Sequence, residues 1–340
     1  MQRFFDAVLG NDTEKERIGK QIVCGKLPHA LILEGEKGTG KKTMALDIAA
    51  ALLCQNKGGD ALPCRTCSAC RKVLASNAQD VRFTDKGDKA SIGVDTIREL
   101  RSDMYLGAGE SDMRIYIIAD AHTMTAQAQN ALLKVLEEPP TAIVIILLTE
   151  RADGLLSTIR SRAQLHRMHL LSKEHLLKFA ATNAALSALS RNDPKKFEQI
   201  LSASAGKAGE LLLLSERSRS NALLAQRELA FSLLDAVSKR KDAGAILQLF
   251  KNFSTKRKEF IEEMGALLLA LRDLCLLERD ENAPMLCFTN RESATEMAIS
   301  IGARKLHRLC ASVEQAVLNA DQLNANMTAT TAALSAAFLA

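Results

Sequence analysis

A glycine-rich stretch, GEKGTGKKT at residues 35–43, constrains the fold of this 340-residue chain more than any other feature. The phosphate-binding loop pattern is a glycine, four residues, then Gly-Lys and a Ser or Thr. Lys41 matches the pattern, but Lys42 stands where the hydroxyl residue belongs. Backbone N–H groups of such a loop can cradle phosphate oxygens. The residues expected to hold a nucleotide are Gly35, Gly38, Thr39, Gly40, Lys41, Lys42 and Thr43.

The segments around this loop have the patterns of an α/β domain. An apolar run at residues 29–33 predicts a buried strand before the loop, and residues 42–53 predict a helix after it. Strands alternating with helices predict a parallel sheet that is covered on both faces. We expect further strands at 80–84, 114–119 and 143–148, and amphipathic helices at 96–104 and 125–138. Thr96 and Glu99 have capping-box spacing, which predicts a helix start at Thr96.

The composition changes near residue 172. Leucine, alanine and charged residues dominate from there to residue 340, and β-branched runs are few. The main breaks lie at 204–209 and 281–284. This pattern predicts a small helical domain that ends near residue 214, followed by a larger helical domain, so the fold class is α/β plus all-α.

Four of the eight cysteines cluster in the segment that follows the predicted helix. Four thiolates satisfy a tetrahedral zinc ion, and no ligand position would then stay open for catalysis. The dense spacing favours a structural zinc site over free thiols in a reducing compartment. The expected ligands are Cys54, Cys64, Cys67 and Cys70. The expected buried packing residues are Cys24, Cys275, Cys287 and Cys310.

Several protein classes are disfavoured by composition. No run of eighteen apolar residues occurs, which argues against a transmembrane helix and a membrane partner. The N-terminal residues lack a signal-peptide pattern, so we expect a cytoplasmic protein. Aromatic residues make up 4% of the chain and tryptophan is absent, which disfavours a base-stacking surface. The net charge of +5 permits contact with nucleic acid without arguing for it.

The loop, the cysteine cluster and three further motifs resemble the bacterial clamp-loader AAA+ family of DNA polymerase III. The motifs are NALLKVLEEPP at 130–140, STIRSRAQ at 157–164 and LNAN at 323–326. The resemblance implies a RecA-like AAA+ parallel-sheet domain at 1–168, with an inserted zinc module at 54–70. It also implies a small helical lid at 169–214 and a helical collar at 215–340 that joins subunits. The implied partners are gamma/tau and delta clamp-loader subunits, the sliding clamp and primer–template DNA.

Part of the magnesium site of a working motor is missing. Lys42 offers no lone pair, and Thr43 points about 100° away on the helix, so the loop would have to rearrange for its hydroxyl to serve. The family's motors end the 114–119 strand in Asp-Glu-x-His. Anchored on His122, the Asp position is Ala119 and the Glu position is Asp120; in the other register Asp120 is the metal ligand and Ala121 replaces the Glu. Asp120 can equally be a cap for the following helix.

Two arginine positions of the family's motors have counterparts here, one in the lid and one in the 157–164 segment. The lid arginine position corresponds to Gly209, with Lys207 as a weak substitute. The Ser-Arg-Cys motif reads Ser161-Arg162-Ala163, so Arg162 resembles an arginine finger acting in trans; without the resemblance, an exposed surface arginine would be the simpler interpretation. The two carboxylates at 137–138 end a helix, which is unfavourable for its dipole unless a cation, for instance on a neighbouring subunit, lies nearby.

These departures lead to one interpretation and two alternatives. The chain is expected to bind ATP or ADP without hydrolysing it, and to act inside a hetero-oligomer whose neighbours hydrolyse ATP. The first alternative is a gamma/tau-type ATPase with an unusual phosphate loop. The second is an AAA+ binding module outside replication.

Overall fold

The computed structural model describes residues 2–87, 89–105, 111–140, 142–283, 285, 287–288, 290–321 and 326–339. The described chain forms two compact units. The first comprises Met1–Thr182 with Gly206–Gly209, and the second comprises Asn183–Ala205 with Glu210–Ala340. The three-domain division at 168 and 214 stays a prediction. Residues 323–325 of the LNAN motif lie outside the described residues.

The first unit is built on a five-stranded parallel sheet in the order β4-β5-β6-β2-β7. The first strand of this sheet along the chain therefore lies between the fourth and the fifth. Ligands of open α/β sheets bind outside the carboxyl ends of strands where the strand order reverses. The phosphate loop follows β2, so it emerges at such a place. The strands are β2 (Ala30–Glu34), β4 (Val81–Thr84), β5 (Arg114–Ile118), β6 (Ile143–Thr149) and β7 (Gln164–Arg167).

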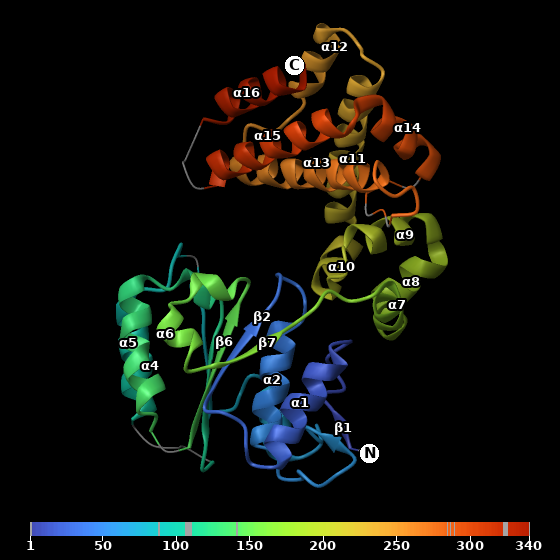
Figure 1. The fold of residues 1–340 in the computed structure, drawn as a ribbon. Coiled ribbons are helices and arrows are strands. Elements are labelled where there is room, and N and C mark those ends of the chain that lie inside the picture. Colours follow the sequence, from blue (N-terminus) through green and yellow to red (C-terminus); the bar gives the residue numbers. More distant parts are fainter. Residues whose placement is uncertain are drawn as a thin grey trace. The chain divides into compact units, whose positions relative to one another are not determined.

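Helices cover both faces of this sheet (Figure 1). Leu31 and Leu33 pack in the cluster on the face of α1 and α2, whereas Ala30 and Ile32 pack in the cluster on the face of α4 and α5. This alternation follows from the two-residue period of a strand. The helices are α1 (Asp12–Val23), α2 (Lys41–Leu52), α4 (Val94–Met104), α5 (Ala126–Glu137), α6 (Ser157–Arg160) and α7 (Lys173–Thr182).

The strands and helices predicted for this unit are confirmed, with one correction at a helix start. Helix α4 begins at Val94 with Gly93 as its N-cap, and no side chain caps it. The capping box predicted at Thr96 and Glu99 is therefore wrong. Helix α5 begins as predicted, because the Thr125 side chain accepts a hydrogen bond from the Ala128 N–H.

A small subdomain is inserted between α2 and β4. It contains β3 (Ala61–Leu62) and α3 (Ser68–Leu74), and β3 pairs in parallel with β1 (Arg3–Phe4). The insertion is thus tied to the start of the chain as well as to α2, on which α3 packs.

The described residues of the second unit form helices and connecting loops, without a strand, in agreement with the predicted all-α part. A shared hydrophobic core joins its long helices. None of the described helices is long and apolar enough to cross a membrane. The helices are α8 (Ala184–Asn192), α9 (Pro194–Ala203), α11 (Arg217–Ser238), α12 (Ala243–Phe250), α13 (Arg257–Leu277), α14 (Arg291–Ile301), α15 (Ala303–Asp321) and α16 (Met327–Leu339), with α10 (Ala208–Ser215) at the unit boundary.

The four scattered cysteines are less buried than expected. Cys24 is exposed at the end of α1, so its assignment as a buried packing residue is wrong. Cys275, Cys287 and Cys310 are half-buried and pack against the helical core. The Sγ atoms of Cys275 and Cys310 lie 3.9 Å apart as free thiols.

Candidate functional site

The phosphate loop is formed by backbone conformations that glycine permits. Gly38 and Gly40 have φ angles of 87° and 92°, in the left-handed region that favours glycine, and Gly40 is the N-cap of α2. Thr39 is buried, and its Oγ1 donates to the Glu36 carbonyl at 2.8 Å. A Cβ atom on Gly35 would lie 2.6 Å from the Met168 carbonyl oxygen. The loop therefore packs tightly against the chain that follows β7.

Lys41 is folded onto the loop. Its Nζ donates to the carbonyls of Gly35 and Glu36, at 2.5 and 2.8 Å. Burial lowers the pKa of Lys41, while the nearby carboxylates of Glu150, Asp120 and Glu36 act in the opposite direction. The ammonium group thus lies at the N-terminus of α2 among acidic side chains, where an outer phosphate would compete for it.

Glu150 was missed by the sequence analysis. It directly follows β6, which pairs with β2, so both strands end at the same edge of the sheet. Carboxyl ends of neighbouring parallel strands converge on the ligand crevice of an α/β sheet. An acidic residue immediately after the 143–148 strand was the signal that could have identified it.

Lys42 has no oxygen to offer a metal ion, and the neighbouring hydroxyl belongs to Thr43. The Lys42 Nζ lies 4.3 Å from the centroid of the Phe83 ring on β4, a cation–π contact. Thr43 is exposed, and its hydroxyl has no partner among the described residues. The residue in the hydroxyl position is thus turned to a strand at the edge of the sheet.

Asp120 follows β5 near Lys41, whereas Ala119 contributes no ligand atom. Asp120 has a φ angle of 49° and occupies the N-cap of a short 3₁₀ helix, η1 (Ala121–Thr123). Its carbonyl, not its carboxylate, accepts from the Thr123 N–H and Oγ1, both at 2.8 Å. Asp120 thus occupies the N-cap position that one interpretation gave it, but its carboxylate makes no capping hydrogen bond.

The segment 206–209, which corresponds to the lid-arginine segment of the family's motors, lies against the loop. Its Gly206 carbonyl accepts from the Leu171 N–H at 2.8 Å, which holds it within the first unit. A Cβ atom on Gly209 would lie 3.6 Å from the Gly38 Cα. Lys207 reaches the loop itself, with its Nζ 2.6 Å from Glu36 Oε2.

Arg162 lies one residue beyond the C-cap of α6 and two residues before β7. Its Nη2 is 2.8 Å from Glu137 Oε1, and its Nη1 donates to the Thr158 carbonyl at 3.0 Å. The side chain is 36% exposed. The cation beside the carboxylates that end α5 is therefore Arg162 of the same chain.

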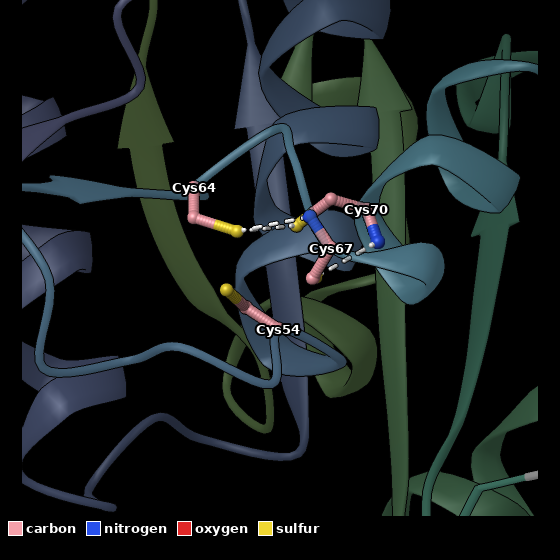
Figure 2. A group of neighbouring side chains, drawn as sticks. All are labelled: Cys54, Cys64, Cys67 and Cys70. Atoms are coloured by element: carbon pink, nitrogen blue, oxygen red, sulfur yellow. Dashed lines mark hydrogen bonds between the residues drawn. The ribbon is translucent and has the colours of Figure 1, made fainter.

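The four clustered cysteines form a compact ligand set. Their Sγ atoms all lie within 4.8 Å of one another, and those of Cys64 and Cys70 are 3.9 Å apart. Figure 2 shows the side chains converging from the loop after α2, the loop after β3 and the start of α3. A tetrahedral zinc with bonds of about 2.3 Å requires sulfur separations of about 3.8 Å. The donor set thus fits a structural metal ion.

Backbone donors surround these sulfurs. The N–H groups of Cys67 and Cys70 point at the Sγ atoms of Cys64 and Cys67, each at 3.4 Å. Hydrogen bonds from the Cys67 N–H and from Thr66 lower the pKa of the Cys64 thiol to about 6, whereas burial raises the pKa of Cys70. Such N–H···S bonds stabilise thiolates, the form that binds metal.

An ion pair connects this cluster to the helix that begins at the phosphate loop. Arg65, between two of the cysteines, donates through Nη2 to Asp47 Oδ1 of α2 at 2.5 Å. Asp47 is fully buried. Burial raises its pKa, which the hydrogen bond and charge of Arg65 oppose.

Residues 10–172 match the model of the protein family described as "DNA polymerase III, delta subunit". Similar proteins include the DNA polymerase III subunit gamma of Buchnera aphidicola subsp. Schizaphis graminum (34% identity) and the subunit delta' of Bacillus subtilis (38%). These alignments cover 52% and 46% of this chain, and 47% and 44% of the relatives. The chain therefore spans about half the length of the curated relatives it matches.

Solved structures are similar over more of the chain but at lower identity. A DNA polymerase III gamma subunit-related protein of Thermotoga maritima has a TM-score of 0.48 and 19% identity, with 95% of this chain and 98% of that chain covered. The RuvB Holliday junction branch migration motor of the same organism has a TM-score of 0.45 and 14% identity, with 81% and 78% covered. Both TM-scores are below 0.5, so the description of the fold rests on the strand order and the glycine-rich loop and not on these structures.

Proposed function

We propose that this chain is a delta prime, stator-like subunit of the DNA polymerase III clamp loader, related to gamma/tau; the support is the family match over residues 10–172 and the similarity to subunits gamma and delta'. In this role it helps to load the sliding clamp onto primed DNA. It works with gamma/tau and delta subunits in the cytoplasm, and the primer–template DNA lies within the assembly. The helical second unit joins the subunits.

One observation carries the proposal: the loop keeps its lysine but has lost the hydroxyl that follows it, and one carboxylate of the motor pair after β5 is absent. Lys42 contacts Phe83 instead of offering a hydroxyl, and Ala119 has no carboxylate. Phosphoryl transfer needs a metal ion that bridges the phosphates, as well as a residue that orients the attacking water. A site with Lys41 and the loop N–H groups alone binds ATP or ADP and does not hydrolyse it.

Arg162 supplies what a neighbouring ATPase site needs. An arginine that reaches the transferred phosphoryl group stabilises the charge that develops in the transition state. Arginine is always protonated and presents a planar fork of donors, which a lysine does not. The support here is its place beyond α6 with a partly exposed guanidinium. We therefore assign it as an arginine finger acting in trans.

Zinc is proposed for the four-cysteine site. Cys54, Cys64, Cys67 and Cys70 would hold it, with no ligand position left for substrate. The bound ion neutralises the thiolates and fixes the inserted subdomain. Arg65 and Asp47 then connect that subdomain to α2, the helix that follows the phosphate loop.

A gamma/tau-type ATPase is the second candidate, because Asp120 and Glu150 lie near Lys41 and can approach a cation. Purified chain and its Lys41→Ala variant separate the two. We expect the wild type to bind ATP or ADP in an equilibrium titration without releasing phosphate in the presence of magnesium. Lys41→Ala should weaken binding by about tenfold or more, the loss of one charge-assisted contact of about 1.5–3 kcal/mol. Steady-state phosphate release that Lys41→Ala abolishes would establish the ATPase instead.

A further inference from the structure

We propose that Glu137 is a positioning residue for Arg162: it fixes the direction of the guanidinium before a neighbouring subunit presents its nucleotide. The inference rests on the proposed function, because it assigns Glu137 a role only if Arg162 acts in trans. The observation behind it is the ion pair of 2.8 Å between Arg162 Nη2 and Glu137 Oε1.

The hydrophobic core holds the backbone of both Glu137 and Arg162 in place. Glu137 is the last residue of α5, whose preceding residues Val135 and Leu136 are buried. Arg162 follows α6, whose Ile159 is fully buried and accepts the Arg162 N–H at 3.0 Å. Helices α5 and α6 also pack on each other in the first unit (Figure 1). Flexibility is thus left mainly to the two side chains.

The hydrogen bonds of Arg162 leave part of the guanidinium free. Nη1 donates to the Thr158 carbonyl at 3.0 Å and to Ser161 Oγ at 3.3 Å, and Nη2 faces Glu137. Arginine has five N–H donors in a rigid fork. Within the described residues, Nε–H and one hydrogen of Nη2 therefore have no acceptor. An incoming phosphate oxygen can bind these without breaking the contacts that orient the group.

Fold stability does not explain this ion pair. The two side chains are 36% and 50% exposed, and pairs of this kind add little to folding. A carboxylate at a helix C-terminus is in addition unfavourable for the helix dipole. What the pair does achieve is the restriction of a long, flexible side chain to one orientation. Such preorganisation lowers the cost of reaching the transition state.

Glu138 provides a matched control. It is adjacent in sequence, exposed, and equally acidic, but its carboxylate has no partner in the described part of the chain. Glu137→Gln and Glu138→Gln remove the same charge from the same helix end. Only the first removes the charged acceptor of Arg162.

The experiment measures steady-state ATP hydrolysis by a clamp loader reconstituted with gamma/tau and delta subunits and each variant of this chain. We expect Arg162→Ala to lower kcat by about tenfold or more. Glu137→Gln should lower kcat by about threefold to tenfold with KM unchanged, because only transition-state contact is affected. Glu138→Gln should leave both constants unchanged. The double variant Glu137→Gln with Arg162→Ala should be no slower than Arg162→Ala alone, because Glu137 acts through Arg162.

Each outcome separates the inference from its premise. If Arg162→Ala has no effect, the arginine-finger assignment fails and the role of Glu137 fails with it. If Arg162→Ala is slow while Glu137→Gln equals or exceeds the wild type, the finger stands and the positioning role is overturned. Additive losses in the double variant, or a lower melting temperature for Glu137→Gln alone, would assign Glu137 a structural role instead.

Discussion

Lys42 illustrates at the residue scale what a motif can and cannot reveal. Its position after Lys41 identified the missing hydroxyl from sequence alone. Its partner, Phe83, comes from β4 at the edge of the sheet, and no local pattern joins the two. The same holds for Glu150 near Lys41, since this contact depends on which strands become neighbours. The sequence thus revealed which residue departs from the motif, but not which distant residue its side chain contacts.

Gly35→Ala tests how tightly the loop is packed. The added Cβ would lie 2.6 Å from the Met168 backbone carbonyl, which a rotamer change cannot relieve. We expect the variant to lose about 1–3 kcal/mol of unfolding free energy, as overpacked sites do. It should also bind nucleotide more weakly, because the loop must shift. Urea unfolding and a nucleotide titration measure the two effects.

Gly58→Ala is the control for that substitution. Gly58 is exposed in the inserted subdomain, and no atom lies within 4 Å of the position of a new Cβ. Its stability and nucleotide affinity should match the wild type within about 0.5 kcal/mol. Equal behaviour of the two variants would mean that the loop is not held against Met168.

At the scale of elements, periodicity predicted the sheet and most helices of the first unit. Buried parallel strands read as continuous apolar runs, which is why 143–148 and 114–119 were recognised. The start of α4 was missed, because Gly93 is a weaker signal than the Thr96 and Glu99 pair. The strand pairing of β1 with β3 was also missed, since two-residue strands carry no period.

Zinc removal tests the element that contains the four cysteines. We expect about one zinc per purified chain and its release by Cys67→Ser. Because a bound ion would tie the loops that carry Cys54 and Cys64 to α3, its loss should expose residues 54–70 to hydrogen exchange and proteolysis. The strands β2, β5 and β6 should stay protected, since they pair with one another and also pack on the helices of the opposite face of the sheet.

Cys24→Ser is the matched control for Cys67→Ser. Cys24 is exposed and lies outside the four-cysteine cluster, so this variant should keep its zinc and its protection pattern. A fully folded wild-type chain without metal, with residues 54–70 as protected as the sheet, would contradict the zinc assignment.

For the whole molecule, the sequence predicted an α/β part followed by an all-α part, and both are present. Composition changes at a domain boundary are visible in sequence, because a parallel sheet and a helical core need different residues. How subunits assemble is not encoded in any local pattern of the chain. The function proposed for Arg162 belongs to this scale, since its proposed target is a nucleotide on another molecule.

ATP hydrolysis by the reconstituted clamp loader is the most direct test of a chain that binds nucleotide but acts on its neighbour. The complex is assembled with wild-type chain, with Arg162→Ala or with Lys41→Ala, and the isolated chain provides the blank. We expect Arg162→Ala to slow the complex by about tenfold or more, with Lys41→Ala close to wild type and the isolated chain inactive. A slow complex with Lys41→Ala and an unaffected one with Arg162→Ala would show that this chain is itself the ATPase.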